Sequence, residues 1–281
     1  MKKWVGVALF LIGLVAPVVL AAQTPSPTPD IKRMTTFEQN LPKDLTPPAD
    51  VVEALILREY GAVFVARGNV TPPKRLVFRD EAEVSDFQTG VESMTENIEA
   101  VPMKLQAPAM RALVDAVREA KDQGLTISPR DTDAAARSYS EAVGLWASRV
   151  EPALDHWTAR GRMTSEDAAR IRSLTPYGQV SEVLSLEKRG MYFAKDLQKS
   201  IIYSVAPPGT SQHLSMLAFD VAEHEDARVR AVLNKHGWFQ TVVSDLPHFT
   251  YLGVSEAHLP RLGLKPKGSG GRVFWVPDLP L

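Results

Sequence analysis

Two short segments in the last third of the chain combine histidine and aspartate in a way that restricts the fold. The first, Pro207–Asp220, contains His213 and, seven residues later, Asp220. The second, Asp245–His248, has a carboxylate three residues before a histidine. Two histidines and a carboxylate are a typical zinc ligand set in hydrolases, where a fourth position stays open for water. A fold that binds one ion with these residues must bring both segments together.

The residues around His213 and Asp220 favour a site that faces the interior. The sequence Pro207-Pro208-Gly209-Thr210 predicts a turn just before His213. The apolar residues Leu217-Ala218-Phe219 predict a strand that carries Asp220 inward. A buried carboxylate needs a compensating partner, and a cation is a suitable one. We therefore predict that His213 and Asp220 are metal ligands.

The second histidine, His248, precedes a predicted strand at Phe249–Gly253. A histidine in this position either caps the strand end or binds a metal. With His213 and Asp220 it completes a ligand set, and we predict that the three residues bind one Zn²⁺ per chain. The chain has no cysteine, which leaves histidine and carboxylate side chains as the zinc ligands.

The two segments resemble the SxHxxGxAxD…ExxWH signature of VanY-type D-alanyl-D-alanine carboxypeptidases, zinc peptidases that act on bacterial cell-wall peptide. The resemblance covers residues 105–262 best. It implies an α+β fold of the Hedgehog/DD-peptidase type, with a small antiparallel sheet flanked by helices and a helix-rich N-terminal extension at Val51–Pro102. It also implies a metallopeptidase that cleaves the terminal D-Ala–D-Ala bond, or a nearby bond, of peptidoglycan stem peptides.

The resemblance implies roles for three further residues. Asp245 stands where these peptidases have a glutamate, the base that takes a proton from the attacking water. Aspartate is one methylene shorter, so Asp245 is either a base that the backbone moves closer or a plain turn residue. Arg137 corresponds to the arginine that stabilises the oxyanion; Arg172 is a competing candidate, and the alternative for Arg137 is an arginine at a helix start that faces solvent. Ser211 matches the family serine and is either a substrate-binding residue or a turn serine.

One departure from the signature concerns Met216, which replaces a glycine. Its long side chain is expected either to line the substrate cleft or to pack into the core. Together with aspartate in place of glutamate, this change leaves a second interpretation open. In that interpretation the chain is a metal-stabilised protein that binds cell-wall peptide on the same fold without cutting it.

The N-terminus has the pattern of a secretory signal peptide. Lys2 and Lys3 precede an apolar run from Trp4 to Leu20, followed by two alanines. We predict a signal peptide at residues 1–22 and export to the periplasm or cell envelope, with an uncleaved membrane anchor as the alternative. Without Lys2 and Lys3 the 32 basic residues become 30, against 33 acidic ones, a formal charge of −3. This charge gives no support for nucleic-acid binding.

The rest of the chain divides into a linker and one domain. Residues 23–48 are rich in Pro, Thr and Ser, which predicts a disordered linker, and residues 49–281 are predicted to form a zinc peptidase-like domain. Apolar spacing predicts helices at Val51–Tyr60, Ala107–Gln123, Arg137–Trp157, from Thr164 onward, and at Asp226–His236. Strands are predicted at Ala62–Ala66, Arg75–Phe78, Leu125–Ser128, Ala218–Ala222, Phe239–Val243 and Phe249–Gly253.

Overall fold

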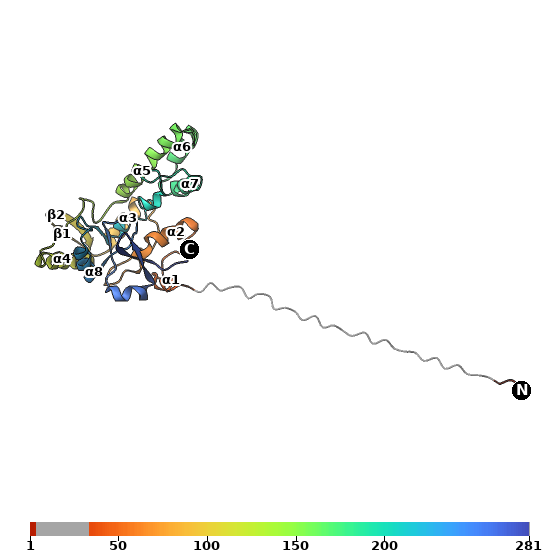
Figure 1. The fold of residues 1–281 in the computed structure, drawn as a ribbon, viewed down its shortest axis with the longest axis horizontal. Coiled ribbons are helices and arrows are strands. Elements are labelled where there is room, and N and C mark those ends of the chain that lie inside the picture. Colours follow the sequence, from red (N-terminus) through yellow and green to blue (C-terminus); the bar gives the residue numbers. More distant parts are fainter. Residues whose placement is uncertain (4–33, 281) are drawn as a thin grey trace. The chain divides into compact units, whose positions relative to one another are not determined.

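The computed structural model describes residues 1–3 and 34–280 (Figure 1). Apart from its first three residues, the predicted signal peptide lies outside the described residues, as does the predicted linker up to Arg33. The chain from Met34 onward packs as one unit. Within the described residues, no helix has the length and apolar character needed to cross a membrane.

Residues 34–280 form an α+β fold with small antiparallel sheets, as predicted. The α-helices are α1 (Thr36–Asn40), α2 (Val51–Tyr60), α3 (Glu81–Gly90), α4 (Ala107–Asp122), α5 (Tyr139–Ala159), α6 (Ser165–Arg172), α7 (Gly178–Glu187) and α8 (Ala227–Lys235). The 3₁₀ helices are η1 (Gly61–Val65), η2 (Ile201–Tyr203), η3 (Gln212–Ser215) and η4 (Glu256–Leu262). The strands are β1 (Ser93–Ile98), β2 (Val101–Gln106), β3 (Ala218–Asp220), β4 (Trp238–Gln240), β5 (His248–Tyr251), β6 (Leu264–Ser269) and β7 (Arg272–Pro277).

The central sheet brings the two ligand-bearing segments together. It has three antiparallel strands in the order β3-β5-β4. In this register Asp220, the last residue of β3, lies opposite His248, the first residue of β5. Every residue of the three strands is buried. The predicted strands in this region are confirmed, although each is shorter than predicted.

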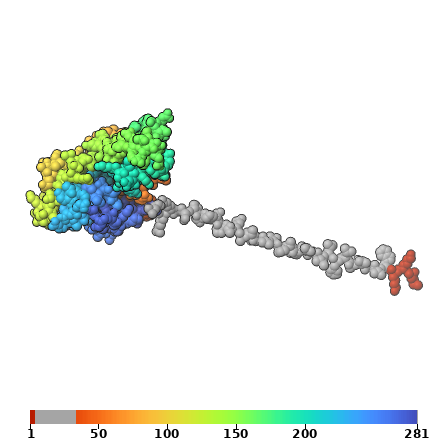
Figure 2. All heavy atoms as spheres, turned by 45° about the horizontal axis from the view of Figure 1, so that its top comes forward, coloured from red at the N-terminus to blue at the C-terminus, as the bar shows by residue number. Residues whose placement is uncertain are grey.

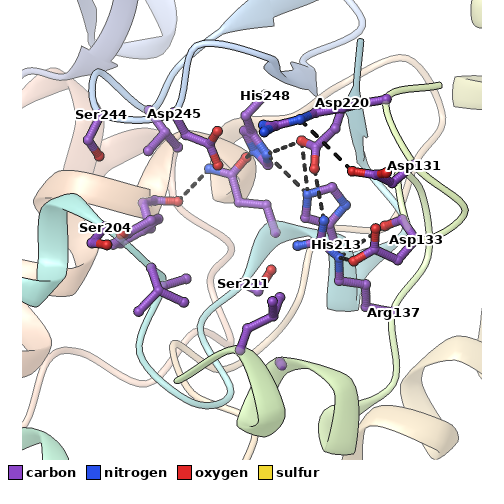
Figure 3. Close-up of a pocket in the computed structure, with 18 of the residues that line it drawn as sticks. Asp131, Asp133, Arg137, Ser204, Ser211, His213, Asp220, Ser244, Asp245 and His248 are labelled. Atoms are coloured by element: carbon purple, nitrogen blue, oxygen red, sulfur yellow. Dashed lines mark hydrogen bonds and ion pairs between the residues drawn. The ribbon is translucent and has the colours of Figure 1, made fainter. Parts of the chain in front are cut away.

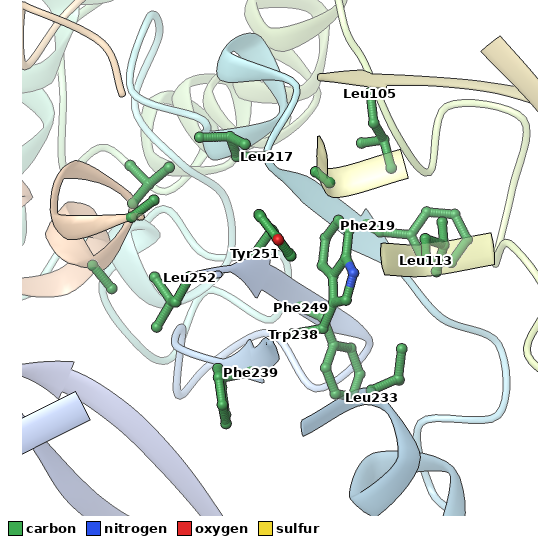
Figure 4. Close-up of a cluster of buried hydrophobic side chains, with 14 of the residues drawn as sticks. Leu105, Leu113, Leu217, Phe219, Leu233, Trp238, Phe239, Phe249, Tyr251 and Leu252 are labelled. Atoms are coloured by element: carbon green, nitrogen blue, oxygen red, sulfur yellow. The ribbon is translucent and has the colours of Figure 1, made fainter. Parts of the chain in front are cut away.

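The core under this sheet is built from aromatic and aliphatic side chains (Figure 4). Trp238 stacks edge-on against Phe219, with ring centroids 6.3 Å apart, and packs against Tyr251 at 5.2 Å. Helix α4 adds Met110 and Leu113, both fully buried. Each such side chain contributes about 1.5–3 kcal/mol on burial. The predicted ligands Asp220 and His248 therefore lie on a closely packed core.

Helices α5, α6 and α7 form a helical arm that extends away from the sheets (Figure 1). The arm has a hydrophobic cluster of its own, which includes Trp146, Val150 and Leu154 of α5. In the space-filling view of Figure 2, the atoms of the arm, drawn in green, adjoin the other atoms of residues 34–280 without a gap. The predicted helices at Arg137–Trp157 and from Thr164 are confirmed, with starts at Tyr139 and Ser165.

Three of the predicted strands are wrong. Ala62–Ala66 belongs largely to η1, which continues directly from α2. All of its residues are buried, so the segment lacks the alternation of buried and exposed side chains that is typical of a strand. Arg75–Phe78 has no strand pairing. Leu125–Ser128 is also unpaired, although the next residue, Pro129, forms an isolated bridge to Val221. Short apolar runs around a turn, and alternation in Leu125–Ser128, indicated strands here, but tertiary packing overrode that local preference.

The predicted linker at residues 23–48 is wrong over its later part. Helix α1 begins at Thr36 and is closed at its N-terminus by a capping box between Thr35 and Glu38. Its Phe37 is fully buried and lies directly against Gly263, where any Cβ would collide with the Phe37 backbone. One buried aromatic residue and one cap therefore fix a segment whose composition predicted disorder.

Candidate metal site

The three predicted metal ligands meet at one point of a pocket (Figure 3). His213 Nε2 lies 3.1 Å from His248 Nδ1 and 3.3 Å from Asp220 Oδ1. His248 Nδ1 lies 3.1 Å from the same carboxylate oxygen. All three side chains are buried. The predicted cluster is therefore present, and its three atoms are placed to bind a metal ion.

Hydrogen bonds on the outer side of each ring determine which nitrogen faces the cluster. His213 Nδ1 donates to the carbonyl oxygen of Ala135 at 2.7 Å. His248 Nε2 donates to Oε1 of Gln212 at 3.0 Å. The Gln212 amide nitrogen donates to the carbonyl oxygen of Tyr60, which fixes its Oε1 toward His248. In the neutral rings, the two nitrogens that face the cluster consequently carry no proton.

This donor set fits a divalent cation. Two unprotonated nitrogens and a carboxylate oxygen facing one another at 3.1–3.3 Å repel one another unless positive charge lies between them. Burial lowers the pKa of His213, which keeps its imidazole neutral near pH 7. Burial alone would raise the pKa of Asp220, but its interactions with His213 and His248 hold that pKa well below its usual value. Two imidazole nitrogens and one carboxylate oxygen suit zinc.

Arg137 lies beside this cluster, between two aspartates. Its Nη2 donates to Asp220 Oδ2 at 2.8 Å, and its Nε contacts the Asp133 carbonyl and carboxylate oxygens at 3.0 and 3.1 Å. The contact to Asp220 uses the oxygen that is not shared with the histidines, so it leaves Oδ1 facing them. The competing candidate Arg172 forms ion pairs with carboxylates of α5 and does not line the pocket. Of the two candidate arginines, Arg137 lines the pocket and Arg172 does not.

Asp245 and Ser211 line the same pocket, which has a volume of about 260 Å³. Asp245 lies in the turn between β4 and β5, where its backbone N–H donates to Val242 and its carbonyl accepts from His248. Figure 3 shows its side chain beside His248. Its carboxylate makes no hydrogen bond or ion pair to other residues of 34–280. It is therefore a carboxylate without a compensating partner among these residues, in the same pocket as the three predicted ligands.

Two residues of the site were not predicted from the sequence. Gln212 is only 2% exposed and binds His248, as described above. Arg149 lines the pocket from α5 together with Ala142 and Leu145, which lie on the same helix face. Among the described residues no carboxylate lies within ion-pair distance of Arg149. Helical spacing could have shown which face Arg149 occupies, but it gives no sign of what that face meets.

Met216 follows η3 and is fully buried without lining the pocket. Of the two predicted positions for its side chain, the structure selects the core. Its φ of 56° lies in the left-handed region, which strongly favours glycine. The buried side chain therefore does not narrow the pocket.

Met216→Gly is expected to lower the free energy of unfolding by about 1–4 kcal/mol. Glycine removes about 1 kcal/mol of left-handed strain, but losing a buried methionine side chain costs about 2–5 kcal/mol. Met216→Ala is the matched control, because it loses the same packing and keeps Cβ, and it should be about 1 kcal/mol less stable than the glycine variant. Urea unfolding measures both. A glycine variant more stable than the natural chain would contradict this account.

The pocket thus combines three atoms that are placed to bind a cation with the carboxylate of Asp245 and the guanidinium of Arg149, neither of which has an ion-pair partner among residues 34–280. Such a set can bind a metal, accept a proton and bind a carboxylate group of a ligand. Comparison of the chain with models of protein families, with curated proteins and with solved structures gives no match.

Proposed function

We propose that this chain is a zinc-dependent peptidase of the Hedgehog/DD-peptidase fold that hydrolyses peptidoglycan stem peptide, as a D-alanyl-D-alanine carboxypeptidase does. The observation that carries the proposal is the convergence of His213 Nε2, Asp220 Oδ1 and His248 Nδ1 in a pocket that also holds the unpaired carboxylate of Asp245. The substrate class comes from the resemblance of the two segments to the VanY-type signature. Such a substrate lies in the cell envelope, which agrees with the predicted export.

In the proposed hydrolysis, each residue of the pocket has a separate role. His213, Asp220 and His248 hold the ion, which when bound supplies Lewis-acid polarisation of water and of a peptide carbonyl. Asp245 accepts a proton as the nucleophile forms and returns it to the leaving amine. Arg137 keeps Asp220 in its orientation and adds positive charge near the carbonyl oxygen, where negative charge develops. In this scheme the Ser211 hydroxyl binds the peptide backbone.

Arg149 suggests how the end of a peptide is recognised. A carboxypeptidase must bind the terminal carboxylate of its substrate, and a guanidinium binds a carboxylate with two charge-assisted hydrogen bonds. Ser204 and Ser148 accept hydrogen bonds from Arg149 at 3.2 and 2.8 Å and hold its guanidinium without neutralising it. Arg149 therefore has its charge available for a ligand, and we assign the terminal carboxylate to it.

Arg149→Gln is expected to raise KM for a peptide with a free terminal carboxylate by about 10- to 100-fold, the cost of one lost hydrogen bond between charged groups. The same peptide with an amidated end should show little change, because it has no carboxylate to lose. Steady-state kinetics on the two peptides gives the comparison, with zinc content measured as a control. An equal loss on both peptides would show that Arg149 does not bind the carboxylate.

Incubation of the zinc-loaded protein with purified muropeptides tests the proposed function. Mass spectrometry should detect released D-alanine and a stem shortened by one residue, and chelation of the metal should abolish both products. Cleavage inside the stem would indicate an endopeptidase of the same class. If no product forms although the muropeptide binds, the proposal of catalysis fails and the binding-protein interpretation replaces it.

A further inference from the structure

Gln212 is neither a metal ligand nor part of the signature, yet it contacts a ligand directly. Its Oε1 accepts hydrogen bonds from His248 Nε2, at 3.0 Å, and from the Thr250 hydroxyl. Its Nε2 donates to the carbonyl oxygen of Tyr60 at 2.8 Å. The Thr250 hydroxyl is itself 2.6 Å from that of Thr241. The side chain is therefore held from both ends inside the protein.

The surroundings allow only one orientation of the Gln212 amide. The carbonyl oxygen of Tyr60 can only accept, so the Gln212 NH₂ group must face it. Tyr60 is the last residue of α2 and the N-cap of η1, and its carbonyl oxygen has two lone pairs, so it can accept the Gln212 bond in addition to a backbone bond of the 3₁₀ turn. The amide oxygen, with both lone pairs in use, is then forced to face His248 and Thr250.

We propose that Gln212 is a positioning residue for the metal site: it selects the His248 tautomer that carries its proton on Nε2 and fixes the ring so that Nδ1 faces His213 and Asp220. The inference rests on the zinc site of the proposed function, and it adds a residue that the ligand pattern does not contain. Hydrogen bonds of this kind on the outer nitrogen of a ligand histidine typically change metal affinity by about 10- to 100-fold.

The first experiment is ¹⁵N NMR of the imidazole nitrogens in the metal-free natural protein, at a pH where the His248 ring is neutral. The expected result is a single tautomer with the proton on Nε2. A proton on Nδ1, or an exchanging mixture of the two forms, would overturn the proposal. This measurement requires neither zinc nor a peptide substrate.

The second experiment measures zinc affinity by competition with a chromophoric chelator. Gln212→Met keeps the size of the side chain and removes the acceptor, so zinc should bind about 10- to 100-fold more weakly. Gln212→Glu keeps an acceptor for His248 and, as the protonated acid, a donor for the Tyr60 carbonyl, and its zinc affinity should stay within about threefold of the natural protein. Gln106→Met is the matched control: Gln106 is equally buried, and within residues 34–280 its side chain hydrogen-bonds only to the backbone of Thr71 and Ser215. The zinc affinity of the Gln106→Met variant should equal that of the natural protein.

Unchanged affinity in Gln212→Met, or an equal loss in Gln106→Met, would overturn the proposal, because the effect would then be absent or general. If Gln212→Met does not fold, the natural tautomer and Gln212→Glu decide the question: a folded Gln212→Glu that loses zinc contradicts the role. Failure of the proposed function has a different signature, namely a zinc-loaded protein that cleaves no peptide while the tautomer and affinity results stand.

Discussion

His248→Ala is expected to reduce the zinc content of the purified protein from about one ion per chain to a small fraction of that value. Removing one of three protein ligands leaves a site too weak to retain zinc against a mild chelator. The variant should also lose the stabilisation that zinc gives the folded state, about 2.7 kcal/mol when free zinc is a hundred times Kd. Elemental analysis and thermal unfolding with and without zinc measure the two effects.

His258→Ala is the matched control for this experiment. His258 is exposed, and its ring contacts the Ser255 hydroxyl in the turn that begins η4. Its removal should leave both zinc content and the zinc-dependent shift in Tm unchanged. Retention of full zinc content by both His213→Ala and His248→Ala would show that the metal binds elsewhere or not at all.

Asp245→Asn is expected to retain zinc and to lower kcat by about 10²- to 10⁴-fold, the usual contribution of a positioned general base. Asparagine has the same size as aspartate but accepts no proton at neutral pH. The expectation rests on the position of Asp245 in the pocket and on its lack of a competing ion pair within residues 34–280. Stopped assays of D-alanine release, normalised to bound zinc, measure the change.

Asp131→Asn provides the control for charge in the pocket. Asp131 lines the same pocket, but its side chain is 73% exposed, and Figure 3 shows it on the far side of His248 from Asp245. Its removal should change kcat by no more than a few-fold. Full activity in Asp245→Asn would exclude Asp245 from the mechanism. Asp245→Glu then tests side-chain length, because a faster variant would show that the shorter aspartate limits the rate.

The sequence by itself determined the residues of the candidate metal cluster and most of the helices near it. His213 and Asp220 stand next to local signals, a proline-glycine turn and an apolar strand, that act over a few residues. Helix α4 likewise follows from apolar spacing within its own length. Such signals are readable because the physical preferences of neighbouring residues produce them directly.

Only the tertiary structure decided how the site is completed. The contact of Gln212 with Tyr60 joins residues 152 positions apart, and that of Arg137 with Asp220 joins residues 83 apart. The place of Arg149 in the pocket depends on how α5 packs against α3 and η3, and the place of Phe37 depends on Gly263. No local pattern encodes these pairings, because each is favourable only once the rest of the core has brought the two partners together.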